Sequence, residues 1–466
     1  MAYDGGKARR VLLSLLTAAT AMAAASRAQA ADRPKSIWEQ ETLTGDWGGA
    51  RTALKDRGID ITLNYIGETL GVLSGGVERR TVYDGRLDFS VDTDLQKLIG
   101  WTGGKTHVTV FQIQNTKAGI DEYAGSIADP SSIDALRTTR LYTAWFEQSF
   151  NDVASLRIGQ LAADDEFFTS ETAGGLINGT FGWASNLAAN ILHGGPSDPM
   201  AAPGVRAKFT PAGDFTVLAA VFTGDPVGAN CNADADDTDP QACNRHGIDA
   251  FALDGGSLWL GEVQYGVNQG KHAMGLPGVY KVGAWYATAD FADQHFGLDA
   301  SGSVITLADG AVTGPLNHSG NWGVYGVADQ MVWRGAASSL NLFVRGGVSP
   351  SDRNLVSYYV DGGAGLKGPL PGRPDDTLTF GMAYAKISRD AVSLDQDNLV
   401  MNTPPYAVRD AETLFELSYI AQLAPWWSLQ PDVQYIRRPN GGQNPDDATQ
   451  ALGHAFIAGI RSTIKF

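Results

Sequence analysis

The chain has 466 residues, a formal net charge of −16 and 43% hydrophobic residues. An acidic protein repels phosphate groups, so the charge argues against a nucleic-acid partner. Two cysteines beside 56 glycines exclude a disulfide scaffold and favour a large β-protein with many turns.

The start of the chain is typical of an export signal. A positive region that includes Arg9 and Arg10 precedes the apolar residues 11–25, and residues 28–30 (AQA) offer a cleavage site. The apolar run is short for a membrane helix, and no later run approaches the ~20 apolar residues that a spanning helix needs. We therefore predict a signal peptide over residues 1–30, followed by a protein that is periplasmic, secreted or a membrane β-barrel.

A short helical segment is expected before the first strand. Residues 43–57 have the pattern of a turn followed by a helix, and Gly58 is well placed to end that helix. We predict that residues 31–57 form a plug or a lid at the periplasmic end of a barrel formed by residues 58–466.

Two-residue alternation recurs along the chain and predicts β-strands. Residues 59–65 alternate strictly, and residues 83–91 place Asp84, Arg86 and Asp88 on one face with apolar residues on the other. Several charges on one face of a strand need water there, such as the water in a barrel lumen. Further strands are predicted at 107–115, 138–149, 155–161, 204–209, 215–222, 257–265, 280–288, 321–333, 339–348, 355–366, 377–388, 411–423, 427–437 and 454–466. The total of about sixteen is even, as a barrel with both ends on one side requires.

Short and long connections tend to alternate between these strands. The short ones are 151–154, 210–214, 335–338 and 424–426, and the long ones are 116–137, 162–203, 223–254, 289–320 and 389–410. Outer-membrane barrels have short periplasmic turns and long extracellular loops. A soluble β-sandwich has no reason to place its long loops so regularly at one end.

The last thirteen residues, 454–466 (HAFIAGIRSTIKF), indicate the surroundings of the barrel. Even-numbered positions from Phe456 to Phe466 are largely apolar, whereas odd-numbered positions include Arg461 and Lys465. In a transmembrane barrel the apolar face contacts lipid and the polar face lines the lumen. We therefore predict an all-β fold: a closed antiparallel transmembrane barrel of about sixteen strands in the bacterial outer membrane, with a short N-terminal helical segment.

Several blocks in this chain resemble the carbohydrate-selective porin family typified by the OprB porins. They are 43–51 (LTGDWGGAR), 157–167 (RIGQLAADDEF), 178–183 (NGTFGW), 320–325 (GNWGVY) with 328–330 (ADQ), and 372–376 (GRPDD). The resemblance covers nearly the whole mature chain. It implies a sixteen-stranded outer-membrane barrel through which monosaccharides, glucose foremost, diffuse passively. The acidic insertion at 231–243 departs from the family pattern.

The candidate site residues follow from the chemistry of sugars. A sugar is neutral, rich in hydroxyls and apolar on its ring faces, so a selective channel needs paired arginines and carboxylates together with aromatic walls. Loop 162–203 is the longest and most like the family, and we expect it to fold into the barrel. The candidate constriction residues are Arg86, Asp88, Arg140, Arg157, Asp164, Asp165, Glu166, Phe168, Asn178, Trp183 and Arg206. The simpler alternative for each is a lumen-lining residue without a role in selectivity.

Arg140 and Glu147 have opposite parity within one predicted strand. Only one of them therefore points into the lumen unless a bulge intervenes between them.

Cys231 and Cys243 flank a stretch that is rich in aspartate. In an oxidising compartment we expect these two cysteines to form a disulfide. A calcium ion at Asp234, Asp236 and Asp237 is a weaker alternative to a solvated acidic loop. We predict no metal and no cofactor.

The adjacent acids of residues 164–166 also suggest catalytic carboxylates of a glycoside hydrolase, but neighbouring acids do not set the spacing across a glycosidic bond. The hydrolase patterns HExxH and GxSxG are absent from the sequence. We therefore predict a substrate-selective sugar porin with sugar and lipid as partners and no enzyme activity. A general or ion-preferring porin is the alternative, and an exported carbohydrate-active enzyme is less favoured. The sequence leaves open which sugar passes and whether the barrel is a monomer or a homo-oligomer.

Overall fold

The computed structural model describes residues 36–116, 119–151, 153–228, 240–249, 255–270, 273–402 and 405–466. The predicted signal peptide, residues 1–30, lies outside this part of the chain. Within the described residues, no helix combines the length and the apolar character that crossing a membrane requires.

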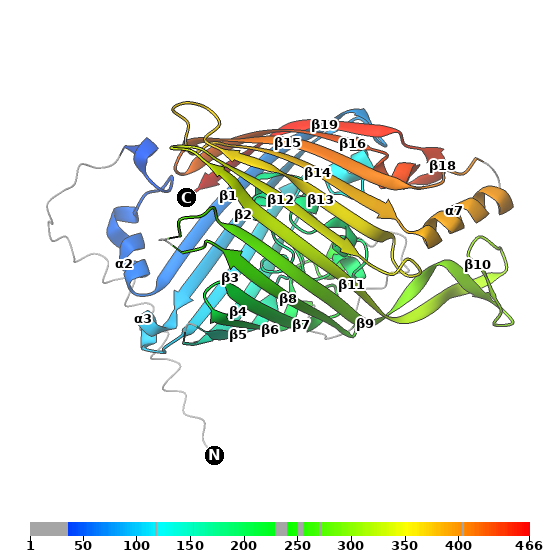
Figure 1. Ribbon diagram of the computed structural model, residues 1–466, viewed down its shortest axis with the longest axis horizontal. Helices are drawn as coiled ribbons and strands as arrows, with labels where there is room; N and C mark the ends of the chain where they lie inside the picture. The colour runs from blue at the N-terminus through cyan, green and yellow to red at the C-terminus, as the bar shows by residue number, and fades with distance from the viewer. Residues whose placement is uncertain are drawn as a thin grey trace, which may run out of the picture.

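Sixteen antiparallel strands close into a barrel (Figure 1). They are β1 (Ile59–Gly75), β2 (Thr81–Asp94), β3 (Gly104–Asn115), β4 (Thr139–Phe150), β5 (Ala154–Leu161), β6 (Ala202–Ala212), β7 (Phe215–Thr223), β8 (Ser257–Val267), β9 (Gly278–Asp299), β11 (Val312–Arg334), β12 (Ser339–Val348), β13 (Val356–Lys367), β14 (Thr377–Ile387), β15 (Ala411–Ala424), β16 (Trp427–Arg437) and β19 (His454–Lys465). Each strand pairs with the barrel strands before and after it, and β19 pairs with β1 to close the cylinder. Each predicted strand overlaps one of these sixteen, so the predicted fold class is confirmed.

The predicted loop 289–320 is wrong, because β9 and β11 continue past the rim as a long hairpin. The short strand β10 (Val304–Thr306) adds to β9 near the hairpin tip. This hairpin extends beyond the barrel beside α7 (Figure 1). Polar residues such as Asp290 and Asp293 ended the predicted strand at 288, but a hairpin that stands in water needs no continuous apolar face.

The barrel wall is apolar outside and polar inside. On β19 the side chain of Ile460 is 45% exposed, whereas the next residue, Arg461, is buried and pairs with Glu68. On β12 the outward Val344 is 50% exposed and the inward Arg345 is 1% exposed. This alternation is that of a barrel with lipid outside and water inside.

The connections differ between the two ends of the barrel. One end has short turns, which include the helix α3 (Leu95–Ile99), and the other has the long loops and α7 (Figure 1). The remaining helices and small strands lie in the connections: α4 (Ile120–Ala124), η4 (Ala173–Gly175), η5 (Gly179–Phe181), α5 (Ser185–Ala188), η6 (Leu192–Gly194), α6 (Pro240–Cys243), α7 (Arg389–Met401), η8 (Pro439–Gly442), β17 (Gln443–Asn444) and β18 (Asp447–Ala451).

The N-terminal segment docks on the short-turn end, beside the seam between β1 and β19. It contains η2 (Ile37–Glu39), η3 (Trp47–Gly49) and α2 (Ala50–Asp56). The amide of Leu43 donates to the carbonyl of Lys465 (2.7 Å), and Arg51 donates to the carbonyl of Phe466 (2.6 Å). Gly58 follows α2 with a φ of +90°, as predicted for the residue that ends this helix.

Candidate functional site

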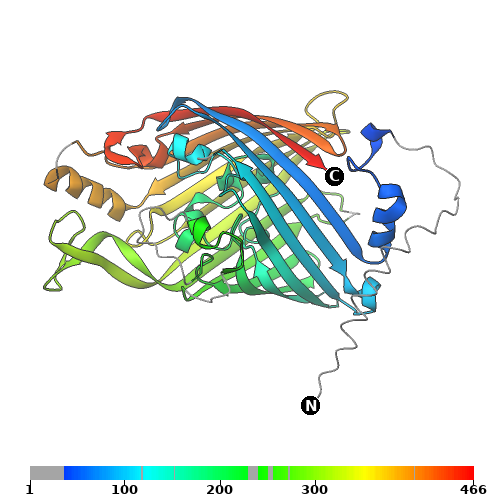
Figure 2. The same ribbon diagram turned by 180° about the vertical axis from the view of Figure 1, so that it is seen from behind.

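Loop 162–203 folds into the barrel (Figures 1 and 2). Carboxylates of the wall accept hydrogen bonds from its backbone. The amide of Phe168 donates to Glu262 on β8 (2.8 Å), and the amide of Thr172 donates to Asp329 on β11 (2.9 Å). These bonds hold the loop against the wall at β8 and β11.

Arg345 on β12 is the central anchor of the loop. Its fully buried guanidinium donates to both oxygens of Asp361 on β13, at distances of 2.6 to 3.1 Å. It also donates to the carbonyls of Phe168 (3.0 Å) and Thr180 (2.9 Å). Hydrogen bonds from a charged donor are stronger than neutral ones. One side chain therefore pins the loop at two separate points.

Two of the predicted site residues, Phe168 and Asn178, stabilise the loop itself. The side chain of Phe168 is 0% exposed and its ring lies 5.2 Å from the guanidinium carbon of Arg345. Asn178 is 1% exposed, donates to Gln434 (3.0 Å) and accepts from the amide of Thr180 (3.0 Å). Neither side chain lines the two cavities described below, so both hold the loop in place.

Arg86 on β2 meets the loop across the channel. Its Nε and Nη2 donate to Asp88 (2.7 and 3.2 Å), and its Nη1 donates to Asp198 near the end of the loop (2.7 Å). The guanidinium also lies 4.2 Å from the centre of the Phe111 ring. Arg86 is therefore held from three directions, at the level where loop and wall come into contact.

A cavity of about 420 Å³ opens on the long-loop side of this contact. Arg86, Asp134, Asp164 and Trp183 are among its lining residues. The indole N–H of Trp183 donates to the carbonyl of Gly194 (2.8 Å), which fixes the orientation of the ring. The cavity therefore combines an aromatic side chain with hydrogen-bonding groups of both kinds.

Two carboxyl groups of this cavity have raised pKa values. Burial, reinforced by the neighbouring Asp165, raises the pKa of Asp164 well above its ordinary value. Burial, followed by the charge of Asp84, raises the pKa of Asp134 to about 8. A protonated carboxyl group donates a hydrogen bond as well as accepting one. Near neutral pH these groups therefore carry less negative charge than their number suggests.

A second group of charges lies at the root of the loop. Glu147 on β4 accepts from Arg157 (2.9 Å) and from Arg206 (2.6 Å), and Arg206 also donates to Glu166 (2.6 Å). The side chain of Arg206 is 2% exposed, and it donates to Ser155 with its third nitrogen. Arg206 is thus buried beneath the channel surface and joins the loop to the wall.

A second cavity, of about 380 Å³, lies on the short-turn side of Arg86. Asp88, Arg157 and Asp165 are among its lining residues. Arg86 and Asp88 are close neighbours on β2, and Asp164 and Asp165 are adjacent on the loop, yet each pair is divided between the two cavities. The cavities therefore lie in series along the channel, with the contact between loop and β2 between them.

A bulge in β4 resolves the parity of Arg140 and Glu147. Tyr142 is the extra residue, because Leu141 and Thr143 pair with consecutive residues of β3. Both charged side chains therefore point inward. Arg140 is 1% exposed and donates to the carbonyl of Asn244 (2.8 Å), away from the two cavities.

Several residues that line or support the channel are not among the predicted site residues. Phe111 stacks on Tyr142 with ring centres 4.4 Å apart, and Trp145 stacks on His107 at 5.0 Å. His107 and Phe111 share one face of a predicted strand, so the alternation contained a signal for them. Asp198 lies in a loop, where no such periodicity exists.

The predicted disulfide falls partly outside the described residues. Cys243 is disulfide-bonded, and its predicted partner Cys231 lies outside the described part of the chain, as do Asp234, Asp236 and Asp237. In the part that the structure describes, no group of three or more His, Cys, Asp and Glu side chains is arranged to hold a metal ion.

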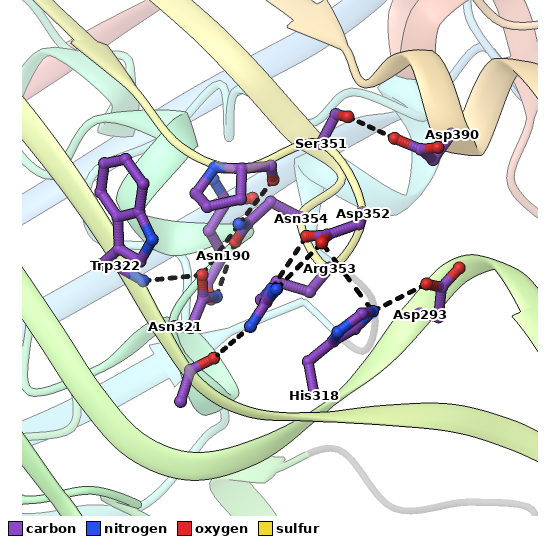
Figure 3. Close-up of polar contacts among 12 residues, drawn as sticks. Asn190, Asp293, His318, Asn321, Trp322, Ser351, Asp352, Arg353, Asn354 and Asp390 are labelled. Atoms are coloured by element: carbon purple, nitrogen blue, oxygen red, sulfur yellow. Dashed lines mark hydrogen bonds and ion pairs between the residues drawn. The ribbon is translucent and has the colours of Figure 1, made fainter.

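Figure 3 shows a separate polar cluster at the long-loop end. His318 on β11 contacts Asp293 on β9 (2.7 Å), and Asn321 donates to Asn354 of the loop 349–355 (2.7 Å). The cluster joins the long hairpin to that loop and does not line either cavity. It positions the loops at the channel mouth.

The arrangement suits a neutral solute with many hydroxyl groups. Opposite charges lie within hydrogen-bond distance of each other, so their fields largely cancel over the width of the channel. The same groups offer donors and acceptors at fixed positions, and Trp183 offers an apolar surface.

Comparisons with known proteins identify the family and the fold of the chain. A family model described as "Carbohydrate-selective porin, OprB family" matches residues 78–466. The chain is 27% identical to Porin B of Pseudomonas aeruginosa over 480 residues, which cover 98% of each chain. It is 24% identical to the putative porin QuiX of Acinetobacter baylyi, covering 92% of this chain and 94% of that protein. The high-pH structure of Pseudomonas putida OprB has a TM-score of 0.78 at 23% identity and covers 93% of this chain and 100% of that one.

Proposed function

Because this chain belongs to the OprB family of carbohydrate-selective porins, we propose that it selects monosaccharides such as glucose where loop 162–203 meets β2. The protein is a sugar-selective channel of the bacterial outer membrane, because its family is that of the carbohydrate-selective porins. It is a porin and not an enzyme. Passage is passive, and selectivity arises from weak binding on the way through.

The contact between Arg86 and Asp198 carries the proposal. It places a guanidinium, two carboxylates and the ring of Phe111 at one level of the channel, next to the cavity that Trp183 lines. A sugar exchanges its water for hydrogen bonds to such pairs. An ion of either sign, in contrast, is repelled by the member of the pair that carries its own sign. This balance favours a sugar-selective channel over a general or ion-preferring porin.

Single-channel recording in planar bilayers tests the proposal. Arg86→Gln removes a charge-assisted hydrogen bond worth about 1.5–3 kcal/mol, so glucose affinity is expected to fall by roughly tenfold or more. Cation preference is expected to rise, because Asp88 and Asp198 lose their counter-charge. Trp183→Leu is expected to weaken sugar block with little change in ion preference.

Two matched variants serve as controls. Arg334→Gln removes an exposed arginine at the end of β11, and Trp259→Leu removes an outward tryptophan that is 53% exposed. Both are expected to behave as the native channel does. If Arg86→Gln and Trp183→Leu also leave glucose block and ion preference unchanged, the selective level lies elsewhere in the channel.

The orientation is the second part of the proposal: the short-turn end, with the N-terminal segment, faces the periplasm. Cysteines introduced at Ser301 in the long hairpin and at Ala337 in a short turn report it, since both residues are exposed. A membrane-impermeant maleimide applied to intact cells is expected to label the first and not the second. Labelling of the second cysteine and not the first would show that the barrel has the opposite orientation.

A further inference from the structure

The cavity on the short-turn side contains hydrogen-bonding groups that the protein leaves unused. Asp165 is exposed in this cavity, and its carboxylate has no hydrogen bond or ion pair to any described residue. Arg157 donates from Nε to Glu147 (2.9 Å) and its Nη1 lies 3.8 Å from Glu166. Its Nη2 has no hydrogen-bond partner among the described residues. One cavity thus holds an unused acceptor and an unused donor.

The other arginines of the channel differ from Arg157 in this respect. Arg86 donates from all three of its nitrogens, to Asp88 and Asp198. Arg206 donates from all three as well and is 2% exposed. Three of the five N–H groups of each of these arginines are thereby bonded to the protein, whereas Arg157 uses one of its five. Among the charged groups that line this cavity, Arg157 and Asp165 therefore have the largest spare hydrogen-bonding capacity for a ligand.

The position of Arg157 is fixed by its neighbours. Its guanidinium carbon lies 3.9 Å from the centre of the Trp145 ring, and that ring is stacked on His107 at an interplanar angle of 17°. The three residues stand side by side on β3, β4 and β5. A donor held in this way loses little conformational entropy when it binds a ligand.

We propose that this cavity is a second monosaccharide site, in series with the one that Trp183 lines. Asp165 accepts, and Arg157 donates, a hydrogen bond to neighbouring hydroxyls of the sugar ring. The inference rests on the proposed function, because it takes sugars as the solutes that reach this level. Two weak sites in series let a sugar leave the constriction without a single deep minimum, which a fast selective channel requires.

Sugar block measured from each side of a bilayer tests this site. With glucose added on the short-turn side, Asp165→Asn and Arg157→Gln are each expected to shorten the blocked time about tenfold or more, as the loss of one hydrogen bond to a charged group implies. With glucose added at low concentration on the long-loop side, the block that depends on Trp183 is expected to persist.

The control is Glu171→Gln, which removes one exposed carboxylate from the same loop but lines a different cavity. It is expected to leave block from both sides unchanged. The second site is refuted if Asp165→Asn and Arg157→Gln behave like Glu171→Gln, or if all three variants weaken block equally. Either result leaves the proposed function intact as long as Trp183→Leu still weakens block. Absence of sugar block in the native channel would instead overturn the proposed function itself.

Discussion

Replacing Arg345 by methionine tests whether one buried side chain sets the geometry of the channel. Arg345 and Asp361 are both 0% exposed at the side chain, so the variant leaves a buried carboxylate without its cation. Breaking such a pair costs about 3–5 kcal/mol. The Tyr359 hydroxyl still donates to Asp361 (2.7 Å), so we expect the lower half of that range, about 3–4 kcal/mol.

The lost free energy destabilises the attachment of the loop to the wall and not the hydrogen bonds between the strands. The carbonyls of Phe168 and Thr180 lose their donor, and the loop is expected to leave the wall before the barrel unfolds. Single-channel records of Arg345→Met should therefore show larger and noisier conductance, together with weaker glucose block. Heat-dependent gel mobility should show a barrel that still forms.

The double variant Arg345→Met with Asp361→Leu removes the uncompensated charge. It is expected to recover part of the native conductance, because a buried ion pair is often replaceable by apolar residues. Arg334→Met, an exposed arginine, is the matched control. If Arg345→Met conducts and blocks as the native protein does, the loop is not held by this anchor and the reasoning is wrong.

Four further outcomes are expected. Ile460→Arg should impair insertion into outer-membrane lipid, at about 2–4 kcal/mol near the midplane, measured by folding into vesicles. The alternation alone predicts that Arg461→Gln is mild. The variant should instead lower stability, because Arg461 pairs with Glu68 (2.6 Å) and its replacement leaves that buried carboxylate without a cation. Because the pKa of Asp134 is about 8 in the folded protein, above its ordinary value, folding favours its protonated form and stability falls as pH rises towards 8. Asp134→Asn should therefore be more stable than the native protein at pH 9 and similar to it at pH 4, as thermal unfolding at the two pH values would reveal. Reduction of the disulfide at Cys243 should leave the barrel closed, since the bond lies in a long connection, and gel mobility after reduction checks this.

The strands were predictable because each carries its own two-residue period. In β2 the alternation alone placed Arg86 and Asp88 on the inner face, where the structure has them. The bulge at Tyr142 was not predictable, because an extra residue shifts the parity of a strand without leaving a mark in its composition. The inward direction of Arg140 and Glu147 followed from that bulge.

The roles of the loop residues depend on partners that are distant in the sequence. Phe168 and Asn178 are candidates by composition, but their contacts with Arg345 and Gln434 bury them. Asp198 became visible as a partner of Arg86 only once loop and wall were placed together. Local sequence therefore predicted which segments form the channel, and tertiary contacts decided which side chains face it.

Because the loop contacts are short-range, they determine how the channel responds to the salt concentration outside the cell. Dissolved salt weakens interactions between charges that are exposed and far apart, and it affects buried pairs in contact much less. The pair of Arg345 with Asp361 is inaccessible to mobile ions, and the carboxylates of β8 and β11 bind the loop amides directly. The channel opening should therefore keep its shape in dilute fresh water and in brine alike.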